Sequence, residues 1–520
     1  MDTAAESVPS SAQAVTGSPA QVAALQAEIQ SLKTQLDWFK KQLFGQKPEK
    51  RLIEPNPDQG ALFDRLAPEE ETATPTEKIT YTRRKGKKQR DEDCATDQGL
   101  RFDGDVPIER IELSPAGLND QNRDQYEIIG EKITRRLAQQ PGSYVVLEYV
   151  RPVLKHKPSQ VLATVPAPTA IFEGCMADVS VLAGLLVDKF VYHLPLYRQH
   201  QRMKDAGITV AHSTLTQWVQ KTLALLEPIA EAQKRHILQR KVLAMDETPI
   251  KAGRKKKGKM QSTWFWPLYG EDDELAFTWS KSRGTAHVEQ ALENFHGTLL
   301  TDGYSAYDCY ARNKPGITQA QCWAHTRRYF IKAEALEPEA VAQSLDFIGK
   351  LYAIEADIRD HQLDREQCLK QRLTQSKPRV DQFFAWCHEQ SQRTDLVNSN
   401  PLAKALTYVR NHQEQLQVYL SDPDVPIDTN HLERALRVIP MGRKNWLFCW
   451  TEVGAQQVGI IQSLLTTCRL QGINPYTYLV DVLMRIDLHP ASEVLDLTPR
   501  VWKDKFADNP LKSDLAMVRQ

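Results

Sequence analysis

The sequence predicts a multidomain chain built around an α/β core with a sheet of mixed sense. The chain has 520 residues, more than the roughly 250–300 that one hydrophobic core usually spans. Between residues 236 and 332, short apolar runs rich in β-branched and aromatic residues alternate with helical stretches. Three hairpin-linked strands followed by a β-α-β pattern favour an α/β sheet. The predicted strands are 241–246, 263–269, 275–279, 297–302 and 318–323.

The N-terminal hundred residues predict three segments of different character. Residues 1–20 are rich in Ser, Ala and Thr and are expected to be disordered. Residues 21–45 predict a dimerising coiled coil, with an amphipathic helix packed on its own chain as the alternative. Residues 46–104, which contain several prolines and a basic run, predict a linker. The heptad positions are Val22, Leu25, Ile29, Leu32, Leu36, Phe39 and Leu43.

The remaining segments complete the predicted organisation. Residues 105–165 predict a small β-containing module, and residues 166–235 a helical region that resembles a helix-turn-helix. Ser213 is the expected N-cap of its second helix, which would present Thr214, Gln217 and Gln220 to a DNA groove; plain helical packing is the alternative. The core is predicted to comprise 236–332 and 425–445, interrupted by a helical insertion at 333–424 and followed by a helical C-terminal region at 446–520.

Charge and cysteine content restrict the function classes. The formal net charge is zero, so only the local basic runs indicate partners. A predicted loop between the first two core strands could neutralise DNA phosphates, or be a solvated surface loop. The eight cysteines include no C-x-x-C pair, and there is neither a secretory signal nor an apolar run of about 18 residues, so we expect a cytosolic protein without a membrane partner. The cations of the loop are Arg254, Lys255, Lys256, Lys257 and Lys259.

Three carboxylates are the strongest candidates for chemistry. Asp246 and Asp302 each end an apolar strand, and Glu433 lies near the start of a predicted helix. Acids that converge from separate elements can hold a pair of hard cations through oxygen ligands, an arrangement suited to phosphoryl transfer. Each also has a local alternative, since both aspartates could stabilise turns and Glu433 could form a capping box or pair with Arg437. Strand alternation argues that Glu247 points to the opposite face from Asp246.

Several short motifs, in this order, resemble those of one family. They are 36–45 (LDWFKKQLFG), 245–249 (MDETP), 301–304 (TDGY), 322–328 (CWAHTRR), 430–434 (NHLER), 443–445 (RKN) and 454–455 (GA). The chain resembles transposases of the insertion-sequence sixty-six family. The resemblance implies a ribonuclease-H-like core in which Asp246, Asp302 and Glu433 form a DDE triad that holds two Mg²⁺ ions, or Mn²⁺. It also implies cleavage at transposon ends and transfer of the freed 3′-hydroxyl into target DNA.

The implied partners are transposon-end DNA, target DNA, further copies of the chain joined through the coiled coil, and accessory proteins of the same element, in a bacterial cytoplasm. Arg434, Arg437, Arg443 and Lys444 are candidate DNA contacts. His325 is expected either beside the active site or as a satisfied core histidine.

Members of the family often carry a Cys-rich zinc segment. Only Cys94 stands in that region here, so no structural zinc is expected. Two other functions remain open: a ribonuclease-H-like nuclease acting on structured nucleic acid, and a non-catalytic transposase remnant that binds DNA.

Overall fold

The computed structural model describes residues 101–102, 106–113, 126–140, 143–157, 160–256, 259–445 and 451–517. The chain divides into two compact units, residues 1–88 and 89–520, and every described residue belongs to the second. The predicted disordered segment, the coiled coil, the N-terminal basic run and Cys94 lie outside the described residues. Of the helices in the described part, none combines the length and the apolarity needed to cross a bilayer.

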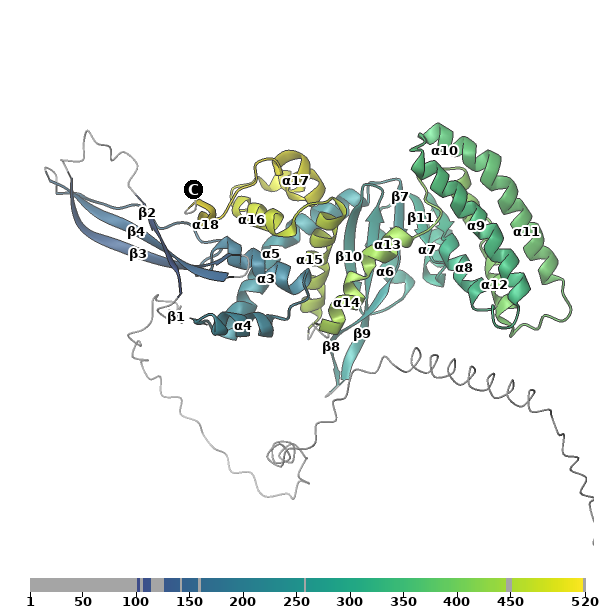
Figure 1. Cartoon of the computed structure of the whole chain (residues 1–520), viewed down its shortest axis with the longest axis horizontal. Helices are drawn as coiled ribbons and strands as arrows, with labels where there is room; N and C mark the ends of the chain where they lie inside the picture. Colours follow the sequence, from purple (N-terminus) through teal and green to yellow (C-terminus); the bar gives the residue numbers. More distant parts are fainter. Residues whose placement is uncertain are drawn as a thin grey trace, which may run out of the picture. The chain divides into compact units, whose positions relative to one another are not determined.

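The described residues form a mixed α/β structure with a six-stranded sheet at its centre (Figure 1). The strand order is β10-β9-β7-β11-β12, and β8 pairs with β9. β9 runs antiparallel to β7, β8 and β10, whereas β11 runs parallel to both β7 and β12. The sequence predicted this mixed sense. The strands are β7 (Val242–Met245), β8 (Thr248–Lys256), β9 (Lys259–Gly270), β10 (Glu274–Ser280), β11 (Gly297–Thr301) and β12 (Ile317–Gln321).

The apolar run of β7 forms a central strand because both of its faces are buried. Leu243 and Met245 pack into a cluster that includes residues of α6 (Thr285–Leu292) and α7 (Ser305–Asn313). Val242 and Ala244 point to the other face and join the largest core cluster. Side chains alternate along a strand, so an all-apolar run is what a strand covered on both sides requires.

The prediction of a basic loop after Asp246 is wrong. Arg254, Lys255 and Lys256 lie in β8, and Lys259 begins β9, so these cations stand on a β-hairpin. Lys257 lies outside the described residues. The register of the hairpin shifts on both sides of Arg254, an irregularity that bends a strand and weakens the period-2 pattern that sequence reasoning depends on.

The helices α5 (His212–Ile237) and α15 (Glu452–Leu470) pack against the outer strand β10. Ser463 Oγ accepts from the backbone N–H of Phe277 at 2.8 Å, and Thr467 Oγ1 accepts from that of Leu275 at 3.1 Å. An edge strand has a row of unpaired backbone groups, and these two hydroxyls bind part of that row. The C-terminal helices thus contribute directly to the core.

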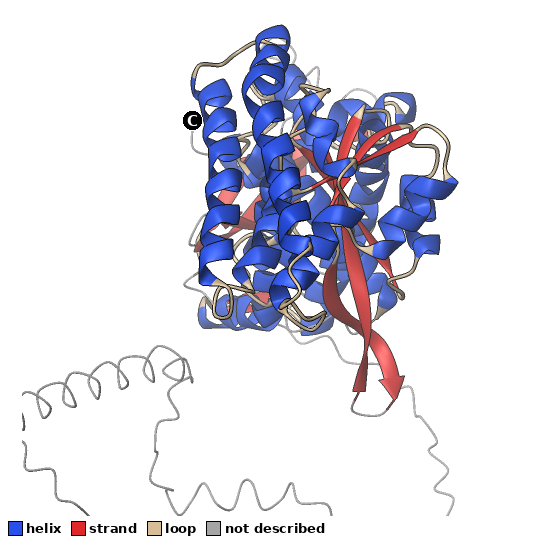
Figure 2. Cartoon of the chain, turned by 90° about the vertical axis from the view of Figure 1, so that its right-hand side faces the viewer, coloured by secondary structure: helices blue, strands red, loops and turns tan. Residues whose placement is uncertain are grey.

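The chain between β12 and the helix of Glu433 is helical and includes the predicted insertion at 333–424 (Figure 2). Four of its helices form a bundle, in which α8 and α11 each contact both α9 and α12. The helices are α8 (Trp323–Ile331), α9 (Pro338–Asp360), α10 (Arg365–Gln371), the π-helix η3 (Arg372–Ser376), α11 (Lys377–Ser391), α12 (Pro401–Asn411) and the 3-10 helix η4 (Gln415–Leu420).

A smaller sheet precedes the helical region. The long strands β3 and β4 form an antiparallel hairpin, β2 runs parallel to β4, and β5 pairs with β4. The end of the predicted linker, β1, pairs instead with β6. These strands are β1 (Arg101–Phe102), β2 (Ile108–Glu112), β3 (Tyr126–Gln140), β4 (Ser143–His156), β5 (Leu162–Ala163) and β6 (Ile208–Thr209).

The helix-turn-helix-like segment consists of α4, β6 and α5. The predicted N-cap at Ser213 is wrong, because α5 begins at His212 with Ala211 as its N-cap. Gln217 and Gln220 are exposed and Thr214 is half-buried. The remaining helices are α3 (Val179–Phe190), α4 (Leu196–Asp205), α13 (Asn430–Leu436), α14 (Val438–Asn445), α16 (Pro475–Arg485), η5 (Ala491–Leu497), α17 (Pro499–Phe506) and α18 (Asp514–Met517).

Candidate active site and its family

Asp246 and Asp302 follow two neighbouring parallel strands. β7 and β11 pair with Ala244 opposite Leu300, so each aspartate stands two residues beyond one of these partners. The ends of parallel strands meet at the same edge of a sheet. A carboxylate oxygen of Asp246, one of Asp302 and one of Glu247 all lie within 4.8 Å of one another. We call these three residues the acid cluster.

The turn after β11 fixes Asp302. Its Oδ1 accepts from the backbone N–H of Tyr304 at 2.9 Å, and its carbonyl accepts from the hydroxyl of Tyr408 on α12 at 2.8 Å. Gly303 has a φ of +83°, and a Cβ there would lie 2.7 Å from Nε2 of Gln321. Any side chain at this position would therefore meet both backbone strain and a clash. Local turn chemistry and the insertion together position this carboxylate.

Glu247 belongs to the acid cluster, contrary to the expectation from strand alternation. β7 ends at Met245, so the alternation does not continue through Glu247. Its side chain is 3% exposed and forms its hydrogen bonds on the side of the sheet that α6 and α7 cover. Arg283 Nε donates to Oε1 at 2.8 Å, and the Tyr307 hydroxyl donates to Oε2 at 2.7 Å. The guanidinium of Arg283 also lies 4.0 Å from the ring centre of Tyr304.

The crowding of these acids changes their protonation. Burial, and then the charges of Asp302 and Glu247, raise the pKa of Asp246 to about 8. Burial also raises the pKa of Glu247, although Tyr307 and Arg283 oppose the shift. Such shifts mark groups whose negative charge is not fully compensated by their surroundings. The cluster offers only oxygen ligands, which are the ligands that Mg²⁺ and Mn²⁺ prefer.

Glu433 lies on α13 and approaches the acid cluster without joining it. Its charge contributes to the raised pKa of Asp246. Its Oε1, however, forms an ion pair with Nη2 of Arg328 on α8. Neither local alternative for Glu433 is observed: the ion-pair partner is Arg328 rather than Arg437, and the backbone N–H of Asn430 is bound by Asp428 Oδ1 at 3.0 Å.

A contact far from α13 in sequence holds its start. Both the backbone N–H and the hydroxyl of Thr429 donate to Sγ of Cys322 at 3.3 Å. The backbone N–H of Trp323 donates to the carbonyl of Ile427 at 3.1 Å. These bonds attach the segment before Glu433 to the junction of β12 and α8. Glu433 therefore comes close to Asp302 although it lies 131 positions later in the sequence.

His325 lies beside Glu433 on α8. Its Nε2 is 3.6 Å from Glu433 Oε1 and 3.0 Å from Nη1 of Arg328. Burial, followed by the charge of Arg328, lowers the pKa of His325. Of the two expectations for this residue, its position favours the one near the active site. Sequence reasoning did not single out Arg328, Arg283 or Tyr408; only Arg328 stood in a recognisable motif.

Comparison with known proteins shows which family the chain belongs to. A model described as "Transposase IS66 family" matches residues 174–457, which is more than half of the chain. The chain belongs to the IS66 transposase family. Further models, "IS66 C-terminal element" and "Transposase C of IS166 homeodomain", match residues 463–499 and 31–95.

Relatives of this transposase occur in Sinorhizobium fredii (strain NBRC 101917 / NGR234). The uncharacterized protein y4hP is 29% identical over 397 residues, which cover 72% of this chain and 71% of y4hP. The uncharacterized protein y4jD is 30% identical over 358 residues, which cover 65% of this chain and 68% of y4jD. The uncharacterized protein y4qI is 29% identical over 417 residues, which cover 76% of this chain and 76% of y4qI.

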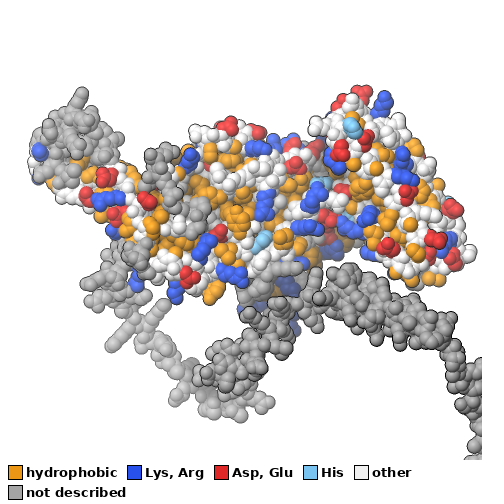
Figure 3. Space-filling model, viewed as in Figure 1, with side chains coloured by type: hydrophobic (Ala, Val, Ile, Leu, Met, Phe, Trp, Pro, Cys, Tyr) orange, Lys and Arg blue, Asp and Glu red, His pale blue; other side chains and the backbone are white. Residues whose placement is uncertain are grey.

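The predicted DNA contacts of the transposase fall into two groups. Arg254, Lys255, Lys256 and Lys259 are exposed on the β8–β9 hairpin, and Arg434 and Arg437 are exposed at α13. Lys and Arg side chains gather over this region of the face drawn in Figure 3. Arg443 is half-buried, and its Nη1 donates to the carbonyl of Pro249 in β8 at 2.7 Å, so part of its role is to attach α14 to the hairpin. The side chain of Lys444 lies outside the described residues.

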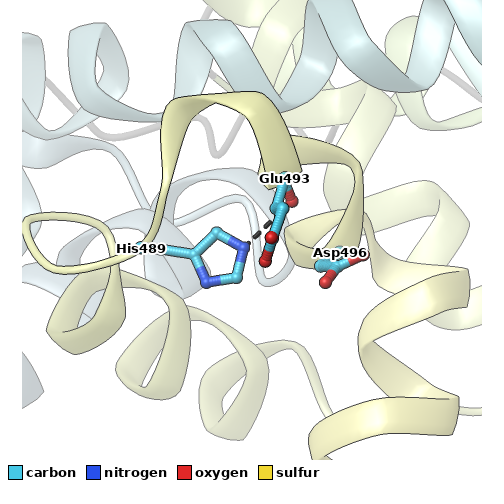
Figure 4. Close-up of side chains that lie close together, drawn as sticks. All are labelled: His489, Glu493 and Asp496. Atoms are coloured by element: carbon cyan, nitrogen blue, oxygen red, sulfur yellow. Dashed lines mark hydrogen bonds between the residues drawn. The ribbon is translucent and has the colours of Figure 1, made fainter.

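A second group of potential metal ligands lies near the C-terminus of the transposase. His489, Glu493 and Asp496 also place ligand atoms within 4.8 Å of one another (Figure 4). The ring Nε2 of His489 donates to the backbone carbonyl of Glu493 at 2.9 Å, and Asp496 is paired with Nζ of Lys505 at 2.5 Å. Two of the three groups are therefore already occupied, and the acid cluster is the better candidate for a cation site.

Proposed function

We propose that this IS66-family transposase is a DDE enzyme. In this proposal Asp246, Asp302 and Glu433 hold two Mg²⁺ ions, or Mn²⁺, for cleavage at transposon ends and transfer of the 3′-hydroxyl into target DNA. The observation that carries the proposal is the meeting of Asp246 and Asp302 at the ends of two paired parallel strands, with carboxylate oxygens within 4.8 Å.

We also propose that the sheet is a ribonuclease-H-like core. Its support is the arrangement of three antiparallel strands, β10, β9 and β7, continued by two parallel strands, β11 and β12. The candidate acids stand at the ends of the two parallel neighbours at its centre. The insertion and the helix α13 then bring Glu433 to the same edge.

The residues of the chain fit divalent cations by charge and by donor type. When bound, a metal pair would stabilise the charge that develops on the attacking and leaving oxygens of a phosphoryl transfer. Asp246 and Asp302 supply rigidly placed oxygens. Glu247, held by Arg283 and Tyr307, adds negative charge at the cluster. Glu433 is shared with Arg328, so its ligation requires that this ion pair loosen or open.

DNA is the proposed partner. The exposed cations of the β8–β9 hairpin and of α13 are suited to backbone phosphates of transposon-end and target DNA. The exposed Gln217 and Gln220 on α5 support a further contact through the helix-turn-helix-like segment. Homo-oligomerisation through residues 21–45, assistance by accessory proteins of the element and action in a bacterial cytoplasm remain part of the proposal. So does the expected lack of structural zinc, because Cys94 lies outside the described residues.

A strand-transfer assay with paired transposon-end DNA, target plasmid and Mg²⁺ tests the proposal. We expect Asp246→Asn to abolish cleavage and joining while its affinity for end DNA stays within about twofold, because the substitution removes a ligand and keeps the shape. Asp360→Asn is the matched control, since Asp360 is 69% exposed at the end of α9. Wild-type activity in Asp246→Asn would overturn the roles assigned here.

The same assay separates the alternatives. Cleavage of structured nucleic acid without joining would favour the ribonuclease-H-like nuclease. Binding of end DNA by the wild-type chain without any cleavage would favour the non-catalytic remnant.

A further inference from the structure

The helix α13 separates the candidate active site from a cavity on its other side. Glu433 faces Arg328 and the acid cluster. His431, Arg434 and Ala435 instead line a cavity of about 580 Å³. Residues of β9, α14, α15 and the loop after α3 complete its wall. This volume lies in the range of about 300–1,000 Å³ that is typical of small-molecule sites.

The cavity is cationic and its cations lack acidic partners. Arg434 and Arg437 reach it from the α13 segment and Arg469 from α15. Among the described residues, no carboxylate forms an ion pair with any of these three arginines. Arg469 uses one nitrogen, Nη2, to bind the carbonyl of Val191 at 3.1 Å. The wall also contains one acid, Asp273, whose Oδ1 accepts a hydrogen bond from the hydroxyl of Tyr269 at 2.5 Å.

Two aromatic rings form a further part of the wall. The rings of Tyr269 and His431 meet edge to face, with centres 4.7 Å apart. Cations beside aromatic rings are the combination that binds nucleotides, because phosphate oxygens pair with guanidinium groups while bases contact rings.

The position of the cavity relates it to the acid cluster. Tyr269 pairs in register with Ala244 of β7, which is two residues before Asp246. At about 3.3 Å per residue this offset along the strand is about 7 Å. Glu433 and Arg434 are adjacent in sequence on α13. A DNA strand bound at the acid cluster can therefore reach the cavity by crossing one short helix.

We propose that this cavity is a nucleotide pocket that takes one unpaired nucleotide of the DNA strand held at the acid cluster, with its phosphate on Arg434, Arg437 and Arg469 and its base against Tyr269 and His431. The assignment to DNA rests on the proposed function. Extruding a nucleotide from a duplex costs free energy, and a pocket with matching charge and aromatic surface offsets that cost.

Titration calorimetry on the full chain without divalent metal tests the pocket. The probes are deoxyadenosine 5′-monophosphate, deoxyadenosine and inorganic phosphate. We expect the monophosphate to bind more tightly than either fragment. The double variant Arg434→Gln/Arg469→Gln should weaken its binding at least tenfold. The matched control Arg410→Gln, at an exposed arginine of α12, should leave binding unchanged.

A second variant keeps all charges. Ala435 lines the cavity and is buried. Ala435→Phe should therefore fill the cavity and also weaken the binding of the monophosphate. Unchanged affinity in both variants would overturn the pocket. Equal affinity for phosphate and monophosphate would overturn the role of the aromatic wall.

A single-stranded oligodeoxynucleotide with one 2-aminopurine distinguishes DNA from free nucleotide as the source. We expect its fluorescence to change on binding to the wild-type chain and to change less with either variant. Binding of the monophosphate without a fluorescence response from the oligonucleotide would overturn the assignment to DNA. These measurements do not involve cleavage, so they stand apart from the outcome for Asp246→Asn.

Discussion

At the scale of single residues, the candidate site is defined by acids placed closer together than their charges favour. Asp246 is surrounded by Asp302, Glu247 and, at longer range, Glu433, and its pKa is raised to about 8. Glu247 is compensated by Arg283, whereas Asp246 accepts only the backbone N–H of Glu247, at 2.7 Å, among the described residues. Asp246 is thus the member of the acid cluster whose negative charge its surroundings compensate least.

This arrangement makes the stability of the metal-free protein depend on pH. Because the pKa of Asp246 rises from 3.8 to about 8 on folding, the folded state binds more protons than the unfolded state between these values. Stability should therefore fall as pH increases from about 4 to about 8. We expect the unfolding midpoint in a chelator to fall further between pH 5 and pH 8 in the wild-type protein than in Asp246→Asn.

Thermal unfolding at several pH values measures this difference, and a change of about 1 kcal/mol corresponds to about 2–4 °C in a domain of 150–250 residues. Asp360→Asn should follow the wild-type curve. Parallel curves for the wild type and Asp246→Asn would contradict the raised pKa.

At the scale of elements, the insertion holds the helix that carries Glu433. Arg372, 3% exposed at the start of η3, donates to both carboxylate oxygens of Glu355 at 2.9 and 2.7 Å. Its Nη1 also donates to the carbonyls of Tyr419, Asp422 and Val425 at 2.7, 3.0 and 3.1 Å. These carbonyls belong to the chain that leads to α13, so one buried guanidinium connects the bundle to that segment.

We expect Arg372→Met to destabilise the protein by about 3–5 kcal/mol, because it leaves a largely buried carboxylate and several carbonyls without their donor. Chemical denaturation should show a lower midpoint. Arg365→Gln is the control: Arg365 is 67% exposed and pairs with Asp424, and surface pairs contribute little. A variant Arg372→Met with the wild-type midpoint would show that this connection does not stabilise the fold.

At the scale of the whole molecule, exposed basic side chains are grouped locally although the chain is neutral overall. The sequence has 66 basic and 66 acidic residues, yet exposed cations stand on the β8–β9 hairpin and at α13, near a cluster of acids. The net charge of the chain is therefore a poor indicator of DNA binding, and the local distribution of charge is a better one. The N-terminal heptads add a proposed means of joining copies of the chain.

Two charges placed in the heptad seam test that assembly. We expect Ile29→Lys with Leu32→Lys to lower the molar mass measured by light scattering, because a coiled coil does not tolerate two buried lysines in one short seam. Gln26→Lys with Gln30→Lys adds the same charge outside the seam and should leave the mass unchanged. An unchanged mass for the seam variant would assign these apolar positions to packing within one chain.

The sequence by itself determined the central strands, the helical insertion and the two strand-end acids. The apolar runs before Asp246 and Asp302 specify central strands because every residue in them must be buried, and the helical insertion follows from its polar, helix-favouring composition. Tertiary structure decided which side chains meet. Glu247 joins the acid cluster because β7 ends one residue before Asp246, and Glu433 pairs with Arg328 because the insertion brings α8 beside α13. The cavity behind α13 likewise depends on packing between distant segments, which periodicity within one segment does not encode. The β8–β9 hairpin is local, and its register shifts hide the period-2 pattern.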